Sequence, residues 1–365
     1  MSEWKSVKLG DCLEFLNGKS IKVQSCGVWP VYGSNGIIGY SEQYLYENAI
    51  VLGRVGAYCG SVARESGKFW ASDNTIVVKS KDSVDIDFCY YQMKIMRLNN
   101  YAGGAAQPLI THSILNGLSL SLPSLATQRR IASVLSSYDS AIANCRRQIA
   151  LLEEAAMRLY KEWFKDGKGE KKRLWDVCDY FRGVSYSSEQ IATLTGMPLI
   201  TLKNIERFGG FHEDRSKFFS GSCKQDSLAS GGDVLMAVTD MTKERRLVGH
   251  VALVPDTYET APYSMDLIKL KGKGVQDLFL YALLRYTNYS EQFAVRASGA
   301  NVLHLKASSL DDISILVPPS KLQESFLSVF QPMVKQKNCL SRQIRALTEA
   351  RDRLLPKLMK GEIAV

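Results

Sequence analysis

The sequence predicts a mixed α/β (α+β) fold in which two globular modules are separated by two long helices that form an antiparallel coiled coil with pseudo-two-fold symmetry. Three observations support this prediction. Sliding the chain by 195 positions aligns residues 103–164 with 298–359 without a gap, and 17 of the 62 positions are identical. Upstream, VKLGDCLEFLNGKS matches KRLWDVCDYFRGVS at an offset of 165, which pairs Leu9 with Leu174 and Gly18 with Gly183. Both copies of the longer repeat also carry apolar residues at helical spacing.

Each copy of the longer repeat begins as a strand and continues as a helix. The runs LSLSLP (118–123) and ISILVPP (313–319) alternate apolar and polar residues and stop at proline, as edge strands do. In the first copy, apolar residues then recur at steps of four and three from Ile131 to Trp163, which is the spacing of a heptad seam. The predicted seam contains Ile142, Ile149, Leu152 and Leu159 in the first helix and Leu340, Ile344, Leu347 and Leu354 in the second.

Three features should interrupt the second helix. Lys337 and Arg351 occupy seam positions, and Pro332 removes a backbone donor. Because proline breaks a helix interior, we expect a short helix, a corner and then a long helix. By the repeat, the first copy should break near Ser136 and Ser137.

The repeat sets the domain boundaries. We predict a first module (1–122), a helical region (123–166), a linker (167–173), a second module (174–317) and a second helical region (318–365). Strand-like runs between glycine-rich turns are found in both modules, and each module has one further helix, near 88–100 and 277–288. The polar, basic sequence GKGEKKR indicates the linker.

Composition excludes several classes of protein. The 365 residues carry a formal charge of +9 and are 45% hydrophobic, which is ordinary for a globular chain and suits a polyanionic partner. No apolar run is long enough for a membrane span, and eight cysteines without a CxxC pair favour reduced thiols. We therefore expect a cytoplasmic protein with no membrane partner and neither a disulfide framework nor a structural zinc.

Motifs for catalysis are missing from the sequence. It contains neither a GxxxxGK[ST] phosphate loop nor a Gly-x-Ser-x-Gly elbow, and only four histidines. We expect a binding protein with no catalytic, cofactor-binding or metal-ligating residues.

Further segments of the sequence are distinctive: WKSVKLGDCLEFLNGKS, WPVYGSNGIIGYSEQY and LGRVGAYCGSVARESGKFWASDNTIVV, and the two P-x-x-x-x-Q helix starts followed by QIALLEEA and QIRALTEA. In these segments the chain resembles the specificity subunit of type I restriction–modification systems. The resemblance implies that each module is a target-recognition domain that reads one half of an interrupted double-stranded DNA site. It also implies that the helices dock two methyltransferase subunits, that restriction/translocase subunits join for cleavage, and that S-adenosylmethionine, ATP and Mg belong to those partners.

Helix length is compatible with such a role. Residues 139–163 would span about 36 Å at roughly 1.5 Å per residue, close to one turn of DNA at about 34–36 Å. The DNA-contacting side chains should be donors and acceptors on loops, because base edges are read by guanidinium, ammonium and amide groups. The predicted contacts in the first module are Lys19, Tyr32, Ser34, Asn35, Arg54, Tyr58, Asn74 and Gln107. Those in the second module are Lys203, Asn204, Thr239, Lys243, Arg245 and Arg246.

Two other functions remain open from the sequence alone. The chain could be a DNA methyltransferase or nuclease with unrecognised motifs, or a coiled-coil scaffold that never touches DNA. Methylation by the isolated chain would favour the first alternative, and a salt titration that finds no steeply salt-dependent DNA binding would favour the second.

Overall fold

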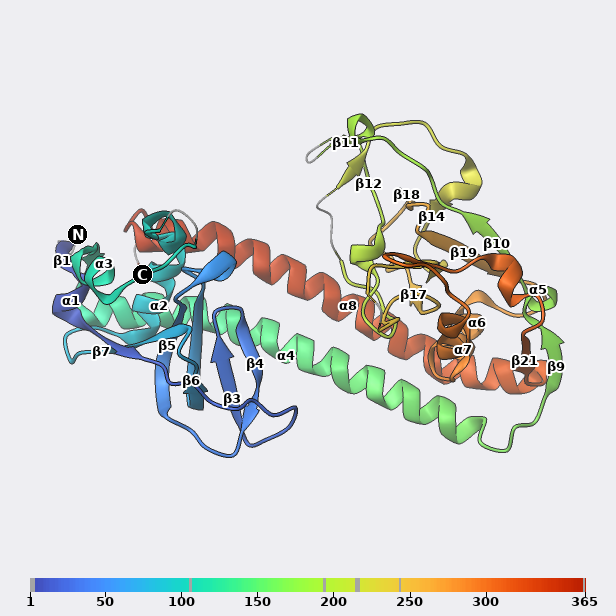
Figure 1. Cartoon of the computed structure of the whole chain (residues 1–365), viewed down its shortest axis with the longest axis horizontal. Coiled ribbons are helices and arrows are strands. Elements are labelled where there is room, and N and C mark those ends of the chain that lie inside the picture. The colour runs from blue at the N-terminus through green and yellow to red at the C-terminus, as the bar shows by residue number, and fades with distance from the viewer. Residues whose placement is uncertain (1–3, 105–106, 193–194, 214–216, 243, 364) are drawn as a thin grey trace. The chain divides into compact units, whose positions relative to one another are not determined.

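The computed structural model describes residues 4–104, 107–192, 195–213, 217–242, 244–363 and 365. The chain divides into two compact units (Figure 1), of which unit 1 comprises residues 1–144 and 344–365 and unit 2 comprises residues 145–343. The division differs from the predicted five segments, because each unit contains one module together with a part of both long helices. The helical regions are therefore shared between two cores rather than folded apart from them.

Unit 1 is built around a six-stranded sheet in which only the β3–β6 pair is parallel. Its order is β2 (Leu13–Asn17), β7 (Thr75–Ser80), β5 (Tyr46–Gly53), β6 (Val62–Ala71), β3 (Trp29–Gly33) and β4 (Gly36–Ser41). The other elements of the module are β1 (Lys5–Lys8), α1 (Leu9–Cys12), η1 (Gly56–Tyr58), α2 (Ile86–Ile95), η2 (Leu98–Tyr101), α3 (His112–Gly117) and β8 (Ser119–Leu122). Helix α2 begins where the Asp85 carboxylate accepts the backbone N–H groups of Asp87 and Phe88.

Unit 2 has a smaller antiparallel sheet, with four strands. Its order is β10 (Cys178–Arg182), β19 (Leu267–Gly272), β15 (Val234–Ala237) and β17 (Val251–Leu253). The remaining strands are β9 (Glu170–Arg173), β11 (Ile191–Ala192), β12 (Met197–Pro198), β13 (Phe218–Phe219), β14 (Leu228–Ala229), β16 (Thr239–Asp240), β18 (Ala261–Pro262), β20 (Leu303–His304) and β21 (Ser314–Val317). The helices are α5 (Leu174–Val177), η3 (Ser188–Gln190), η4 (Leu202–Asn204), η5 (Gln225–Ser227), α6 (Asp277–Arg285), α7 (Tyr289–Val295) and η6 (Ala307–Leu310).

The two sequence offsets reappear as matching elements. Strand β1, helix α1 and strand β2 coincide with β9, α5 and β10 after a shift of 165, and β8 coincides with β21 after a shift of 195. In each unit the first strand pairs with the last, as β1 with β8 and β9 with β21. The prediction that 167–173 is only a linker was therefore wrong for its last four residues, which form β9. The strand was hidden because β9 lies at an edge and its four residues are all charged and exposed, so it shows no apolar alternation.

In the P-x-x-x-x-Q repeat, the glutamine side chain hydrogen bonds back to the backbone before the start of each long helix. The Gln128 side-chain amide donates to the Pro123 carbonyl at 3.0 Å, and the Gln323 amide donates to the Pro318 carbonyl at 2.7 Å. Both glutamines are buried. A buried amide needs such a partner, which explains why the two copies agree at these positions.

Both long helices are continuous. Helix α4 runs from Leu125 to Trp163 and α8 from Ser320 to Met359, 39 and 40 residues respectively. The predicted breaks at Pro332 and near Ser136 were wrong. Pro332 is exposed, and so is Ser328, whose carbonyl would have bonded to the missing N–H. The Ser328 carbonyl that lacks its donor is therefore on the solvent side. The proline destabilises the helix too little to break it, because the helix is packed along its other face.

The helices pair in antiparallel orientation within each unit. In unit 1 the Arg351 guanidinium contacts the Asp139 carboxylate, and in unit 2 the Lys337 ammonium contacts the Glu153 carboxylate. The two basic residues that interrupted the predicted seam thus each meet an acid on the facing helix. Of the predicted seam residues, Ile142 and Leu340 are buried and the others are half-buried: Ile149, Leu152, Leu159, Ile344, Leu347 and Leu354.

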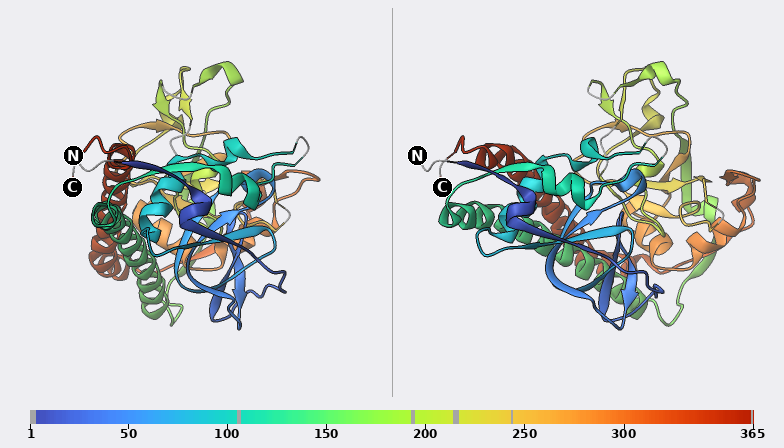
Figure 2. Two further views of the ribbon diagram at one scale, coloured as in Figure 1. Left: turned by 90° about the vertical axis from the view of Figure 1, so that its left-hand side faces the viewer. Right: turned by 60° about the vertical axis from the view of Figure 1, so that its left-hand side comes forward.

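The C-terminal end of each long helix is buried in a module. Leu355, Leu358 and Met359 of α8 belong to the core of unit 1, where α8 lies beside α4 (Figure 2). Tyr160 of α4 is buried in the core of unit 2, with Trp163 packed against it. Within the described ranges, no helix has an apolar stretch of the length that a bilayer crossing requires.

Candidate nucleic-acid interface

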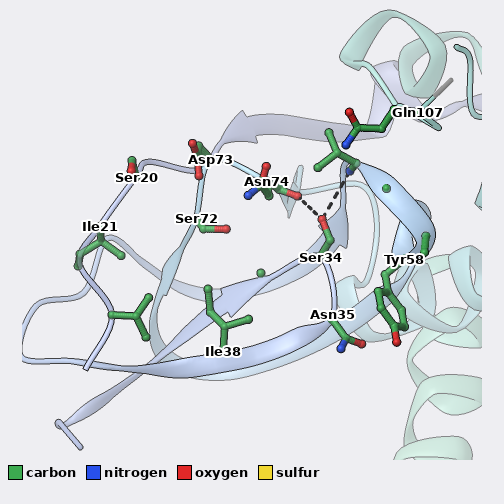
Figure 3. Close-up of a pocket in the computed structure, with 15 residues that line it drawn as sticks. Ser20, Ile21, Ser34, Asn35, Ile38, Tyr58, Ser72, Asp73, Asn74 and Gln107 are labelled. Carbon is green, nitrogen blue, oxygen red and sulfur yellow. Dashed lines mark hydrogen bonds between the residues drawn. The ribbon is translucent and has the colours of Figure 1, made fainter. Parts of the chain in front are cut away.

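A polar depression in unit 1 collects most of the predicted contact residues of the first module (Figure 3). It has a volume of about 530 Å³. Its lining combines five separate segments of the module, and it includes the predicted residues Ser34, Asn35, Tyr58, Asn74 and Gln107. Amide and hydroxyl groups dominate this set. Such groups can both donate to and accept from base edges.

The turns that form this depression are tied together by Ser34. Its hydroxyl donates to the Asn74 carbonyl at 2.7 Å, and the Ser34 carbonyl accepts from the Ser61 hydroxyl at 2.7 Å. Asn35 follows at the tip of the β3–β4 hairpin, where Gly36 has φ +85°. The Asn35, Asn74 and Gln107 side chains are exposed, and so is the Tyr58 ring. The backbone is thus fixed while these side chains face solvent.

Ser72 adds a group that the sequence did not single out. Its hydroxyl points into the depression (Figure 3), and the residue is only 6% exposed. Among the described residues and groups, nothing hydrogen bonds to Ser72 Oγ. A buried hydroxyl without a partner is costly, so this oxygen is suited to an added ligand.

The remaining predicted residues of the first module differ in exposure. Lys19 is exposed, and its backbone carbonyl accepts from the Trp70 indole at 2.7 Å. Arg54 is half-buried. The prediction of a DNA contact by Tyr32 needs correction, because its ring is buried in the sheet core and its hydroxyl donates to Glu65. Burial and the neighbouring carboxylate both raise the pKa of Tyr32, which holds the phenol neutral.

In unit 2 a buried carboxylate organises the predicted basic segment. Asp240 accepts the backbone N–H groups of Thr242 at 2.8 Å, Leu247 at 2.7 Å and Val248 at 3.3 Å, and also the Thr242 hydroxyl. Burial alone would raise its pKa, but these hydrogen bonds outweigh burial and hold the pKa of Asp240 below the usual value. An ionised Asp240 therefore holds Thr242, Leu247 and Val248, which flank the basic residues Arg245 and Arg246.

This basic segment is only partly available to a ligand. Arg245 and Arg246 are half-buried, and Arg245 adopts a left-handed backbone conformation with φ +52°. Lys203 is exposed on η4. Lys243, also predicted to contact DNA, lies outside the described residues.

Two predicted contacts of the second module are structural. Asn204 is 1% exposed, and its side chain and that of Thr201 cap η4 reciprocally. Thr239 is buried and donates to the Asp266 carboxylate at 3.0 Å. Both expectations are corrected for the same reason: short polar side chains on loops frequently hydrogen bond to their own neighbourhood.

The prediction missed Phe208 and Met241. Phe208 is 55% exposed in a left-handed conformation with φ +62°, and Met241 is 77% exposed beside the basic loop. The Phe208 N–H donates to the Arg246 carbonyl at 2.7 Å, and Arg285 donates to the Phe208 carbonyl. A bulky residue is held in this strained conformation only by such contacts. The aromatic residue before Gly209 was the signal that the sequence offered.

Comparisons with known proteins agree with the repeat and the fold. The family model described as type I restriction modification DNA specificity domain matches residues 1–154 and 167–349. The chain is 27% identical over 310 residues to the type I restriction enzyme MjaIX specificity subunit of Methanocaldococcus jannaschii, covering 78% of this chain and 71% of that protein. It is 21% identical to the MjaVIII specificity subunit of the same organism, covering 100% of this chain and 93% of the relative.

A solved structure shares the fold. The crystal structure of the type I restriction–modification S subunit from M. genitalium superposes with a TM-score of 0.64 at 17% identity, covering 98% of this chain and 96% of the other. At that identity the likeness concerns the fold.

Proposed function

The chain belongs to the type I restriction–modification DNA specificity family, and from that premise we propose a function for each of its parts. Each module reads one half of a bipartite double-stranded DNA site. The long helices set the gap between the halves and dock two methyltransferase subunits, and restriction subunits join that complex for cleavage. The chain itself is non-catalytic and works in the cytoplasm, with S-adenosylmethionine, ATP and Mg held by its partners.

One observation carries this proposal. The two units begin and end with matching elements, β1, α1, β2 and β8 in unit 1 and β9, α5, β10 and β21 in unit 2, yet the exposed loop chemistry differs between them. Unit 1 offers an amide-lined depression, whereas unit 2 offers a basic loop beside Phe208. A repeated scaffold with different loops is what two readers of different half-sites require.

Module exchange tests the proposal directly. Residues 174–317 are replaced by the corresponding module of another specificity subunit, and the DNA methylated by the reconstituted complex is sequenced. One half of the site should change while the other half stays the same. A simultaneous change of both halves would contradict the division of labour. Methylation by this chain without partner subunits would instead establish an enzyme.

A scaffold that never binds DNA is the second alternative to test. The methyltransferase-bound complex is titrated with duplex DNA at increasing salt concentration. A reader that neutralises phosphates should lose affinity steeply with salt. Absence of binding at low salt would favour the scaffold.

A further inference from the structure

The two interhelical ion pairs have the same polarity. Both acids, Asp139 and Glu153, are on α4, and both bases, Lys337 and Arg351, are on α8. The acids are two heptads apart, and the bases are separated by the same distance in the opposite direction. Both pairs therefore belong to one antiparallel register.

These four residues are enclosed, so their charges must be matched. The Arg351 side chain is 16% exposed and that of Asp139 is 29% exposed. Asp139 also accepts the Tyr91 hydroxyl at 2.7 Å. The Lys337 and Glu153 side chains are each 26% exposed. An enclosed charge that loses its partner is much more costly than an apolar residue at the same position.

The repeat shows what each residue would meet in a pair of identical helices. After the shift of 195, Arg351 corresponds to Ala156 and Lys337 corresponds to Ile142. In the same antiparallel register, a second α4 would therefore set Asp139 against Ala156 and Glu153 against Ile142. Both carboxylates would lose the cationic side chain that pairs with them across the helices.

The same argument excludes two copies of α8. Asp139 corresponds to Val334 and Glu153 corresponds to Thr348. Arg351 would then face Val334 and keep only the Asp352 carboxylate of its own helix, and Lys337 would face Thr348, so that neither cation would meet an acid on the facing helix. Between the helix ends the apolar seam permits either symmetric pair, because Ile149, Leu152 and Leu159 recur as Ile344, Leu347 and Leu354.

We propose that these two ion pairs choose the partner helix: the α4 seam accepts an α8-type helix, from this chain or from a second copy, and each helix rejects its own kind. Resting on the proposed function, this excludes symmetric pairs of half-subunits, which would present one module twice and read a palindrome. These two ion pairs would also restrict recombination between subunits to exchanges that keep one helix with the two acids and one helix with the two bases.

The test uses the full chain with a protease site inserted between Gly167 and Lys168 and cut after folding. The two pieces are unfolded together, refolded by dilution and weighed as pairs by native mass spectrometry. The wild-type pieces should recombine as unlike pairs, in at least about tenfold excess over like pairs. Like pairs at a random frequency, roughly half of the total, would overturn the proposal.

Two quadruple variants isolate the charges. Asp139→Val, Glu153→Thr, Lys337→Ile and Arg351→Ala give each helix the residue of its repeat. This variant should raise the fraction of like pairs to roughly half of the total, the random value. Asp139→Arg, Glu153→Lys, Lys337→Glu and Arg351→Asp exchange the charges, and unlike pairs should persist. An apolar variant that stays as selective as wild type would overturn the proposal.

The uncut chain supplies a readout that does not depend on refolding. Reversing only the α4 acids, as Asp139→Arg with Glu153→Lys, should lower the melting temperature on the order of 10 °C. The charge-exchanged quadruple variant should recover most of that loss. An equal loss in both variants would show that the charges act singly, and would overturn the proposal.

Discussion

The two units bury the ends of the long helices in sites of different chemistry. In unit 1, Leu355 and Leu358 of α8 share a core with Ile131 and Leu135 of α4. In unit 2, Phe326 of α8 is surrounded by the rings of Tyr160 at 5.6 Å, Trp163 at 6.1 Å and Phe164 at 5.4 Å. These positions correspond in the repeat, Ile131 to Phe326 and Tyr160 to Leu355.

The difference shows what the repeat preserves. The strand order β2-β7-β5-β6 of unit 1 matches the order β10-β19-β15-β17 of unit 2, whereas the side chains around the buried helix ends differ. Large and small side chains have been exchanged on both sides of each contact together, which keeps the packing dense. A duplicated fold can therefore diverge to 17 identities in 62 positions and still build the same site twice.

Truncating the centre of the aromatic site should give the largest effect. Phe326 is fully buried and also packs on Phe279 and Phe330, so Phe326→Ala leaves a cavity among several rings. We expect unit 2 to lose about 3–5 kcal/mol. The matched change in unit 1, Ile131→Val, should cost about 1 kcal/mol. Denaturant unfolding followed by hydrogen exchange of each unit measures both, and equal losses would refute the contrast.

The paired glycines mark a position where the two units should behave alike. A Cβ at Gly18 would lie 1.8 Å from the Ser72 carbonyl oxygen, and one at Gly183 would lie 2.1 Å from that of Ser264. Because a backbone oxygen cannot rotate away, Gly18→Ala and Gly183→Ala should each cost about 1–3 kcal/mol. Thermal unfolding measures this cost. Gly117→Ala, which meets nothing within 4 Å, is the control and should shift stability by less than about 0.5 kcal/mol.

The sequence predicted the framework because long-range identity and periodicity encode it. The strands next to the two prolines, the central strands and both long helices follow from these patterns. Strand β9 was missed although the offset of 165 extends back to β1, since its four charged side chains resemble a linker. The two-residue strands β11 to β14 are too short to show any period.

The candidate site was less predictable for a physical reason. Residue type indicated which loops carry amides and guanidinium groups, and five of the eight residues predicted in the first module line one depression. Type does not reveal whether a polar side chain faces solvent or its own backbone. Tyr32 is buried with its hydroxyl bonded to Glu65, and Asn204 is buried as a cap of its own helical turn.

The loop of unit 2 should depend on an ionised carboxylate, unlike the depression of unit 1. Asp240→Asn places an amide donor against backbone N–H groups, and we expect a loss of about 2 kcal/mol at neutral pH. Since the folded pKa is lowered, the wild-type advantage is present above the unfolded pKa of about 4 and is lost as the pH falls through the folded pKa.

Stability measured from pH 7 down to pH 3 checks this expectation. The wild-type and Asp240→Asn curves should converge at the acidic end. Asp256→Asn is the control, because its half-exposed ion pair with Arg342 should contribute less than about 1 kcal/mol. A gap between the curves that is independent of pH would mean that Asp240 acts by shape rather than by charge.

Substitutions in the two reading surfaces should affect DNA binding in different ways. Asn35 is an exposed amide at the rim of the unit 1 depression, whereas Arg246 is half-buried on the basic loop of unit 2. In the methyltransferase-bound complex, Asn35→Ala should cost about 1–3 kcal/mol for the cognate half-site, relax the preference at one base, and leave the salt dependence unchanged. Arg246→Ala should weaken all sequences alike and reduce the salt slope by about 1, because a guanidinium contacts phosphate without reading sequence. Duplexes randomised in one half-site at a time, titrated at several salt concentrations, distinguish the two outcomes, and Arg345→Ala on the exposed side of α8 is the control. If Arg246→Ala instead relaxes a base preference at an unchanged salt slope, the basic loop reads base edges, and the chemical contrast between the units lies in which bases they read.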